Sequence, residues 1–331
     1  MDQGLKTKTN YPTEAKKTDI ICIGHITHDR IVTPDREVHM PGGTSFYFSY
    51  GIRHLLGERD DISYRLITSL SEKDMKVVND MRREGIEVDV IPSRETVYFE
   101  NIYDANQNNR RQRVRAKADP FSCEKLGDVN ARYIVLGTLL ADDFDLSTIR
   151  FLSKRGTLVV DVQGYLREVR GDKVFACEWK DKIEALRYVD ILKVNEYEIE
   201  VLTGEPDQHR ACEMLAQWGV REVLLTLGSY GSVVYVDGQF FDIPACEPLR
   251  IVDATGCGDT YVMAYVLRRH LGDTPEQAAR IASAVASIKL EASGPFLGTM
   301  EDALQRLKKS YTNATVNNLA AGKDENDNIP S

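Results

Sequence analysis

The sequence predicts an α/β fold, in which helices cover a parallel β-sheet and a small second β-sheet forms a lid. Five short, β-branched and almost continuously apolar segments recur along the chain, as expected for strands buried on both faces. Helical patterns lie between them, and this alternation is typical of parallel sheets. Two strand pairs fall outside the alternation and indicate the second sheet.

The expected elements can be placed individually. Ser71 begins a helix with a capping-box pattern, which Met75, Val78 and Met81 continue at helical spacing. Pro275 begins another helix, because proline is favoured in the first turn. The expected buried strands are residues 19–24, 133–137, 157–162, 189–194 and 223–227.

Three segments predict hairpins. Residues 30–40 turn around Pro34-Asp35, and residues 96–103 and 110–116 are two strands joined by a polar turn. Asp237-Gly238, between two apolar runs, is a strong hairpin signal. The first two pairs would make the lid, over about residues 30–41 and 96–117.

Composition limits the classes of protein to which the chain can belong. The chain has 331 residues with 42 basic and 51 acidic side chains, so its net charge of −9 gives no reason to expect nucleic acid as a partner. Residues 1–18 lack the apolar core of a signal peptide, and no apolar run approaches the roughly 18 residues that span a membrane. The six cysteines have no zinc-type spacing and are expected to be reduced thiols in a cytoplasmic protein.

The segment DATGCGDTYVMAYVLRRHL, residues 253–271, predicts the chemistry. Gly256, Cys257 and Gly258 can turn tightly, so that backbone amides and the start of the following helix form an anion hole. Asp259 beside it suits a base that takes the proton of a hydroxyl attacking phosphorus. The structural alternative is a glycine-rich turn in which Asp259 caps the helix.

DATGCGD resembles the second signature of the ribokinase-like (PfkB) carbohydrate kinases, and other motifs follow in that family's order. GHITHD ends the first strand, so the resemblance implies that Asp29 binds sugar hydroxyls. Gly42 and Gly43 match the hinge glycines between lid and main domain. A carboxylate at a strand end can accept two hydrogen bonds from a diol, which suits a polyhydroxylated substrate.

Two further motifs match the family's nucleotide-binding motifs. Asn195 and Glu198 match its NxxE motif, in which the Glu orders the hydration shell of Mg²⁺. Thr226, Gly228 and Gly231 match its TLGxxG turn against the nucleotide phosphates. The resemblance therefore implies ATP and Mg²⁺ as cofactors.

The resemblance implies a ribokinase-like three-layer α/β/α main domain over residues 19–309 with a small β-sheet lid. It also implies ATP-dependent phosphorylation of a hydroxyl on a sugar or sugar-like polyol. Residues 1–18 are expected to be flexible, and residues 310–331, which are Asn-rich and acidic, to be a disordered tail. Two copies could pair as a homodimer through the exposed lid.

The chain departs from the family pattern near the acceptor site. Thr44 to Phe48 replace the usual Lys and Asn contacts, and Phe46 and Phe48 could stack on a base, so a nucleoside kinase is an alternative. The run from Asp161 to Arg167 is reminiscent of the inositol-kinase branch. A nonenzymatic sugar sensor on a kinase scaffold is a third hypothesis.

The role of an arginine run and the need for a monovalent cation are both left open by the sequence. Arg111, Arg113 and Arg115 are expected on one face of a lid strand, either solvated or holding an anionic group over the cleft. The family often holds a monovalent cation such as K⁺ beside the anion hole, on carbonyls near Asp253 and residue 294. Lys289 lies nearby in this sequence, which leaves the need for the ion open.

Overall fold

A computed structural model describes residues 17–103 and 110–321. Its main sheet has nine strands in the order β15-β14-β13-β12-β9-β8-β1-β4-β5. All neighbours from β13 to β5 pair in parallel, whereas β14 and β15 form an antiparallel hairpin at one edge. The strands are β1 (Thr18–Gly24), β4 (Tyr64–Leu70), β5 (Glu87–Pro92), β8 (Ala131–Gly137), β9 (Thr157–Asp161), β12 (Ile191–Asn195), β13 (Glu222–Thr226), β14 (Ser232–Val236) and β15 (Gln239–Ile243).

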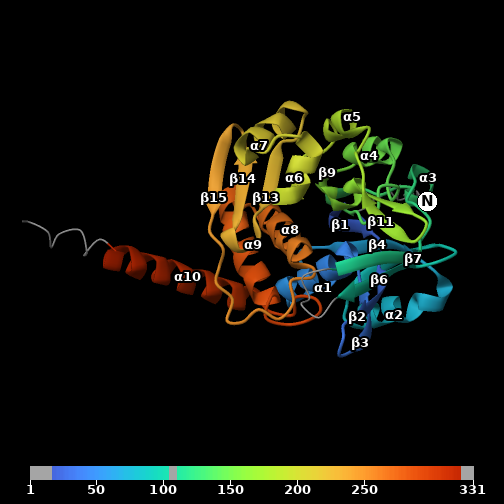
Figure 1. Ribbon diagram of the computed structural model, residues 1–331, viewed down its shortest axis with the longest axis horizontal. Helices are drawn as coiled ribbons and strands as arrows, with labels where there is room; N and C mark the ends of the chain where they lie inside the picture. Colours follow the sequence, from blue (N-terminus) through green and yellow to red (C-terminus); the bar gives the residue numbers. More distant parts are fainter. Residues whose placement is uncertain (1–16, 104–109, 322–331) are drawn as a thin grey trace, which may run out of the picture.

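Helices cover both faces of this sheet, which makes three layers (Figure 1). Alternate strand residues enter two separate cores, because successive side chains point to opposite faces. Ile20 and Cys22 of β1 join the core under α1, α8 and α9, whereas Ile21 and Ile23 join the core under α4 to α7. The helices are α1 (Thr44–Leu56), α2 (Met75–Arg83), α3 (Cys123–Leu126), α4 (Leu146–Ser153), α5 (Lys182–Leu186), α6 (Glu196–Thr203), α7 (Gln208–Gln217), α8 (Cys257–His270), α9 (Pro275–Lys289) and α10 (Met300–Ala321).

A second sheet of six strands forms the lid, in the order β10-β11-β7-β6-β2-β3. Its strands are β2 (Thr27–Val32), β3 (Glu37–Gly42), β6 (Val97–Tyr103), β7 (Arg110–Ala116), β10 (Arg167–Arg170) and β11 (Lys173–Ala176). Since β2 follows β1 after two residues, the lid starts directly at the carboxyl edge of the main sheet. Asp29 therefore lies on a lid strand.

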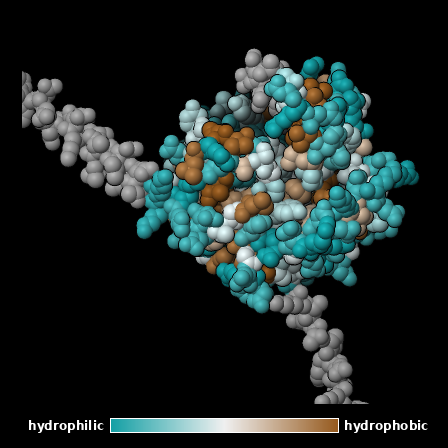
Figure 2. All heavy atoms as spheres, turned by 90° about the horizontal axis from the view of Figure 1, so that it is seen from below, coloured by the Kyte–Doolittle hydropathy of each residue, from teal (hydrophilic) through white to brown (hydrophobic). Residues whose placement is uncertain are grey.

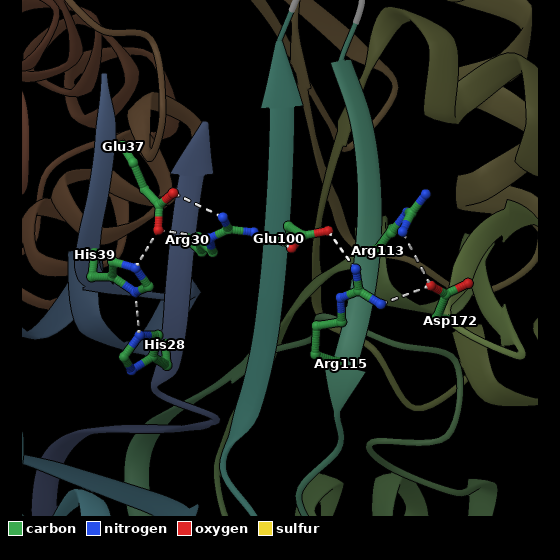
Figure 3. A network of polar contacts seen from close by, with 8 residues as sticks. All are labelled: His28, Arg30, Glu37, His39, Glu100, Arg113, Arg115 and Asp172. Atoms are coloured by element: carbon green, nitrogen blue, oxygen red, sulfur yellow. Dashed lines mark hydrogen bonds and ion pairs between the residues drawn. The ribbon is translucent and has the colours of Figure 1, made fainter. Parts of the chain in front are cut away.

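Ion pairs link the lid strands across their exposed face (Figure 3). Glu100, only 4% exposed, lies 2.5 Å from Arg30 on one side and 2.8 Å from Arg115 on the other. Burial would raise the pKa of Glu100, but Arg115 and Arg30 hold it below its ordinary value. Arg113 and Arg115 also contact Asp172. These two arginines are thus ion-paired within the lid sheet, an arrangement that neither sequence interpretation of the arginine run included.

Most sequence predictions of elements are confirmed. The five apolar runs are strands of the main sheet, all three hairpins form, and Pro275 begins α9 behind a capping box at Thr274. Asp237 and Gly238 both have positive φ, as a tight hairpin turn requires. The polar turn 104–109 and the terminal residues 1–16 and 322–331 lie outside the described residues.

Other predictions need correction. Ser71 makes no side-chain cap, because Thr96 donates to Asp74 and accepts the N–H of Ser71 instead. Strands β4, β5, β10 and β11 were not expected, since they carry charged residues or are short. Helix α10 extends to Ala321 and so includes the first residues of the segment from residue 310 that was expected to be disordered.

The exposed surface is mostly hydrophilic in the view of Figure 2, and its hydrophobic side chains form several small patches. This matches the 28% of charged residues in the sequence. Within the described residues, no helix combines the length and apolarity needed to cross a membrane.

Candidate active site

The predicted anion hole lies at the start of α8, in a loop that we call the anion loop (residues 253–258). Gly256 is the N-cap of α8 and has a left-handed backbone, with φ of 78°. A Cβ there would overlap the ring of Tyr47, so both the conformation and the close approach require glycine. Asp253 accepts the N–H of Thr255 at 2.9 Å and tightens the turn.

The amides of this turn are not equivalent. Cys257 N–H donates to the carbonyl of Ala254 at 3.2 Å within the turn. Gly258 N–H lies in the first helical turn, where it has no intrahelical acceptor. The amides of Gly256 and Gly258 are therefore better placed to bind an anion than the amide of Cys257. The helix dipole adds positive potential at this end of α8.

Asp259 follows in the first turn of α8 and has an unusual carboxyl group. Burial and the nearby charge of Asp161 raise its pKa from 3.8 to about 6, although Lys193 and the hydroxyl of Thr44 lower it. A carboxyl group that titrates near neutral pH can accept a proton and release it again. Asp259 is only partly buried, so its side chain keeps some exposure to solvent.

Lys193 is the cation beneath this carboxylate. It is 5% exposed, and its Nζ lies 3.1 Å from Asp161 Oδ2 and 3.8 Å from Glu198 Oε2. A Cβ on Gly258 would lie 3.1 Å from the same Nζ, so the ammonium lies against the anion loop. Burial disfavours this charge, but the three carboxylates, that of Asp259 included, raise the pKa of Lys193 above its ordinary value. We call these four residues the Lys193 cluster.

The substrate residues predicted on the lid side lie together. Asp29 Oδ1 accepts a 2.7 Å hydrogen bond from Thr27, and a Cβ on Gly42 would lie 2.5 Å from Asp29 Oδ2. Gly43 has φ of 90° and passes close to the carbonyl of His25. The two glycines therefore let the chain turn from β3 into α1 directly behind the Asp29 carboxylate.

Tyr47 connects the two halves of the site. Its ring packs on Gly256, and burial together with the charges of Asp253, Asp29 and Asp259 raises the pKa of its hydroxyl. Tyr47 is thus within electrostatic reach of both the predicted substrate aspartate and the predicted base.

The neighbouring aromatics do not reach the site. Phe46 is packed against Tyr47 and Tyr50, and Phe48 against Tyr64, all within the core. The expectation that Phe46 and Phe48 could stack on a base is therefore wrong, because a helix presents successive residues to different faces.

The predicted nucleotide residues lie at the carboxyl ends of two paired strands. Asn195, which ends β12, is in register with Thr226, which ends β13. Asn195 and Glu198 form a reciprocal capping box on α6, with bonds of 2.9 and 2.8 Å, so this motif also has a structural role. Gly228 and Gly231 both have positive φ in the turn after β13.

Magnesium fits the donor set at this edge. Among residues 17–103 and 110–321, no three His, Cys, Asp or Glu side chains gather as a metal site. Mg²⁺ needs no such cage, because one or two carboxylates, waters and substrate phosphates hold it. Burial raises the pKa of Glu198, while Lys193 lowers it, so Glu198 is a carboxylate already embedded among charges. Glu198 is the residue that would hold the hydrated ion.

Sequence reasoning missed Lys193, and it gave Arg167 no role beyond its place in the run that is reminiscent of inositol kinases. Lys193 lies in the apolar run of β12, where a lone lysine among buried residues was the available signal. Arg167, the first residue of β10, lowers the pKa of both Asp259 and Glu198 and so brings positive charge from the lid sheet.

Comparison with known proteins identifies the protein family. Residues 108–303 match the pfkB family carbohydrate kinases. Ribokinase from Arabidopsis thaliana is 30% identical over 193 residues, which cover 55% of this chain and 47% of the ribokinase. Cytidine kinase from Thermococcus kodakarensis is 26% identical over 80% of this chain and 92% of its own length.

A solved structure shares the whole fold. A pyrophosphate-dependent kinase of the ribokinase family, in complex with a pyrophosphate analogue and myo-inositol, is 28% identical with a TM-score of 0.76. The match covers 86% of this chain and 98% of that kinase. The chain belongs to the pfkB family of carbohydrate kinases, and its three-layer fold with a β-sheet lid is ribokinase-like.

Proposed function

We propose that this protein is an ATP-dependent kinase that phosphorylates a hydroxyl group of a sugar-like polyol, with a cyclitol as the leading acceptor class. The observation that carries the proposal is Asp259, a carboxylate with a pKa of about 6 beside an amide-built anion loop and the Lys193 ammonium. Asp259 accepts the proton of the acceptor hydroxyl as its oxygen attacks phosphorus. The amides of Gly256 and Gly258 stabilise charge on the transferred group.

The remaining groups position and shield the reactants. When bound, Mg²⁺ neutralises phosphate charge, with Glu198 behind its waters. Asp29 accepts hydrogen bonds from acceptor hydroxyls, and the lid excludes water, so that the donor is not hydrolysed. Phosphoryl transfer depends mainly on positioning and electrostatic stabilisation, which this arrangement supplies.

Three observations favour a cyclitol over a nucleoside. The solved relative with myo-inositol is 28% identical and aligns over 86% of the chain, and the run from Asp161 to Arg167 is reminiscent of inositol kinases. Burial of Phe46 and Phe48 removes the aromatic surface on which a nucleobase would stack. The identity to cytidine kinase keeps a nucleoside as the second candidate acceptor.

The donor is a separate choice between ATP and pyrophosphate. Leu249, Ile251 and Val252 are exposed large apolar side chains in the segment that leads into the anion loop. Exposed apolar side chains of this kind suit the base of a nucleotide, whereas pyrophosphate has no group to place on them. We therefore favour ATP.

The test is a matrix of donors and acceptors. ATP and pyrophosphate are each offered with myo-inositol, ribose, fructose and cytidine, and phosphorylated product is detected by mass spectrometry. We expect ATP with a cyclitol to give the highest kcat/KM. Product from cytidine alone would support the nucleoside kinase, and transfer to none of a broad polyol and nucleoside panel would support the nonenzymatic sensor.

Asp29→Asn tests the acceptor site. Asparagine keeps the shape of the side chain but loses its charge and an acceptor, so we expect the KM for the acceptor to rise about tenfold while kcat changes less than about threefold. Asp35→Asn, at the exposed turn of the same hairpin, is the matched control. An unchanged acceptor KM in Asp29→Asn would remove this residue from the substrate site.

A further inference from the structure

Lys289, the last residue of α9, is a charged side chain with almost no exposure to solvent (2%). Its Nζ donates to the carbonyl of Asp253 at 2.8 Å and to the carbonyl of Ala292 at 3.4 Å. The carboxylate of Asp253 lies 3.5 Å away. An ammonium thus lies among oxygen atoms from two separate segments of the chain.

These two segments are the anion loop and the turn after α9. The carbonyl of Leu290 accepts the N–H groups of Val252 and Asp253 at 2.8 and 3.2 Å, so the segments are joined at the position of Lys289. The ring of Tyr47, which packs on Gly256, has its centroid 5.8 Å from the same Nζ. The ammonium therefore lies directly against the anion loop and its neighbouring turn.

The charge of Lys289 also acts electrostatically on the anion loop. Burial raises the pKa of Cys257 to about 11, and Lys289 acts in the opposite direction. A positive charge at this place favours an anion bound by the neighbouring amides, because few mobile charges screen a buried cation.

Carbonyl oxygens in such an arrangement are ligands that a monovalent cation prefers. The family resemblance implies a K⁺-like ion on carbonyls near Asp253 and residue 294, and the structure permits a test of that expectation. Here the ammonium of Lys289 already takes the carbonyls of Asp253 and Ala292. A second cation among the same oxygens would meet direct repulsion, so these residues do not fit an additional K⁺.

We infer that Lys289 is the built-in cation of this site: its ammonium replaces the monovalent ion, holds the anion loop in shape and makes the protein independent of K⁺. Lys289 is a positioning residue, since it acts on reactants through the loop and touches none of them. Its effect on catalysis depends on the proposed kinase function, whereas its effect on cation binding and stability does not.

The unaltered protein provides the first test. Melting temperature and, where transfer is detected, kcat/KM are measured in KCl, NH₄Cl and choline chloride at equal ionic strength. We expect no cation-specific change in melting temperature and less than a twofold change in kcat/KM. A rise of several degrees in KCl over choline chloride, or a tenfold activation by K⁺, would overturn the inference.

A matched pair of variants provides the second test. Lys289→Ala removes the ammonium and leaves room for an ion, whereas Lys289→Met removes the charge but fills the space. We expect both to melt about 5 °C lower in choline chloride, because the carbonyls and Asp253 lose their partner. KCl or NH₄Cl should restore part of the melting temperature of Lys289→Ala and none of that of Lys289→Met.

Activity and a control complete the experiment. K⁺ should also raise the kcat/KM of Lys289→Ala at least tenfold. The control variant Lys154→Ala, which removes an exposed lysine, should respond to no cation. If Lys289→Ala folds but gains neither stability nor activity from K⁺ or NH₄⁺, Lys289 is only a structural ion-pair partner. If the unaltered protein transfers no phosphate to any acceptor, the proposed function fails, and the melting data still decide the role of Lys289.

Discussion

Asp259→Asn is expected to lower kcat by about 10² to 10⁴-fold while the KM for the acceptor changes little, since a positioned base contributes an effect of this size. Asparagine has nearly the same shape but cannot take the proton of the acceptor hydroxyl. In the unaltered protein, kcat/KM should fall about tenfold per pH unit below pH 6, because protonation of a carboxyl group with a pKa of about 6 removes the base. Any residual kcat/KM of the asparagine variant should not show this fall below pH 6.

The same substitution should stabilise the fold at neutral pH. The pKa of Asp259 is raised from its ordinary 3.8 to about 6, so its contribution to stability is present at low pH and is lost as the pH rises through about 6. At pH 7 the charged carboxylate is therefore unfavourable. With its partial exposure taken into account, Asp259→Asn should increase the free energy of unfolding by about 1–2 kcal/mol, measured by urea denaturation at pH 7.

Asp128→Asn is the control for both measurements. Asp128 is exposed and precedes β8, at the edge of the sheet opposite the site, so neither kcat nor stability should change. Near-normal transfer by folded Asp259→Asn would show that another group takes the proton.

Lys193→Met is expected to have the second largest effect, on both stability and catalysis. Its ammonium offsets the charges of Asp161, Glu198 and Asp259, so its loss leaves these carboxylates without the buried cation that they share. Breaking a buried ion pair on one side costs about 3–5 kcal/mol of unfolding free energy. The pKa of Asp259 should also rise further, which moves the acidic limb of the pH profile to higher pH.

The double variant Lys193→Met/Asp161→Asn separates these effects. It removes both partners of the closest pair, so we expect it to regain much of the stability lost in Lys193→Met without regaining activity. Recovery of both would mean that Lys193 only compensates for Asp161 and has no role in phosphoryl transfer. Urea denaturation and the pH dependence of kcat/KM provide the two readouts.

The local features of this chain were predictable because each depends on neighbouring residues. Apolar runs identified five strands of the main sheet, and Asp237-Gly238 identified the hairpin between β14 and β15. The glycines before Asp259 predicted a tight turn at the start of a helix, which α8 confirms. Strand β10 was missed because it is short and charged, and the lid sheet alone orders it.

By itself the sequence determined the fold class, the order of its motifs and the candidate base Asp259, since hydrophobic periodicity and glycine spacing are properties of short segments. Only the tertiary structure decided that Tyr47, rather than its phenylalanine neighbours, lies between Asp29, the proposed substrate residue, and the anion loop. It also decided which oxygens surround the buried ammonium groups of Lys193 and Lys289. The physical reason is that an electrostatic partner is selected by distance in space, and the chain brings these charges together only when its strands and helices pack.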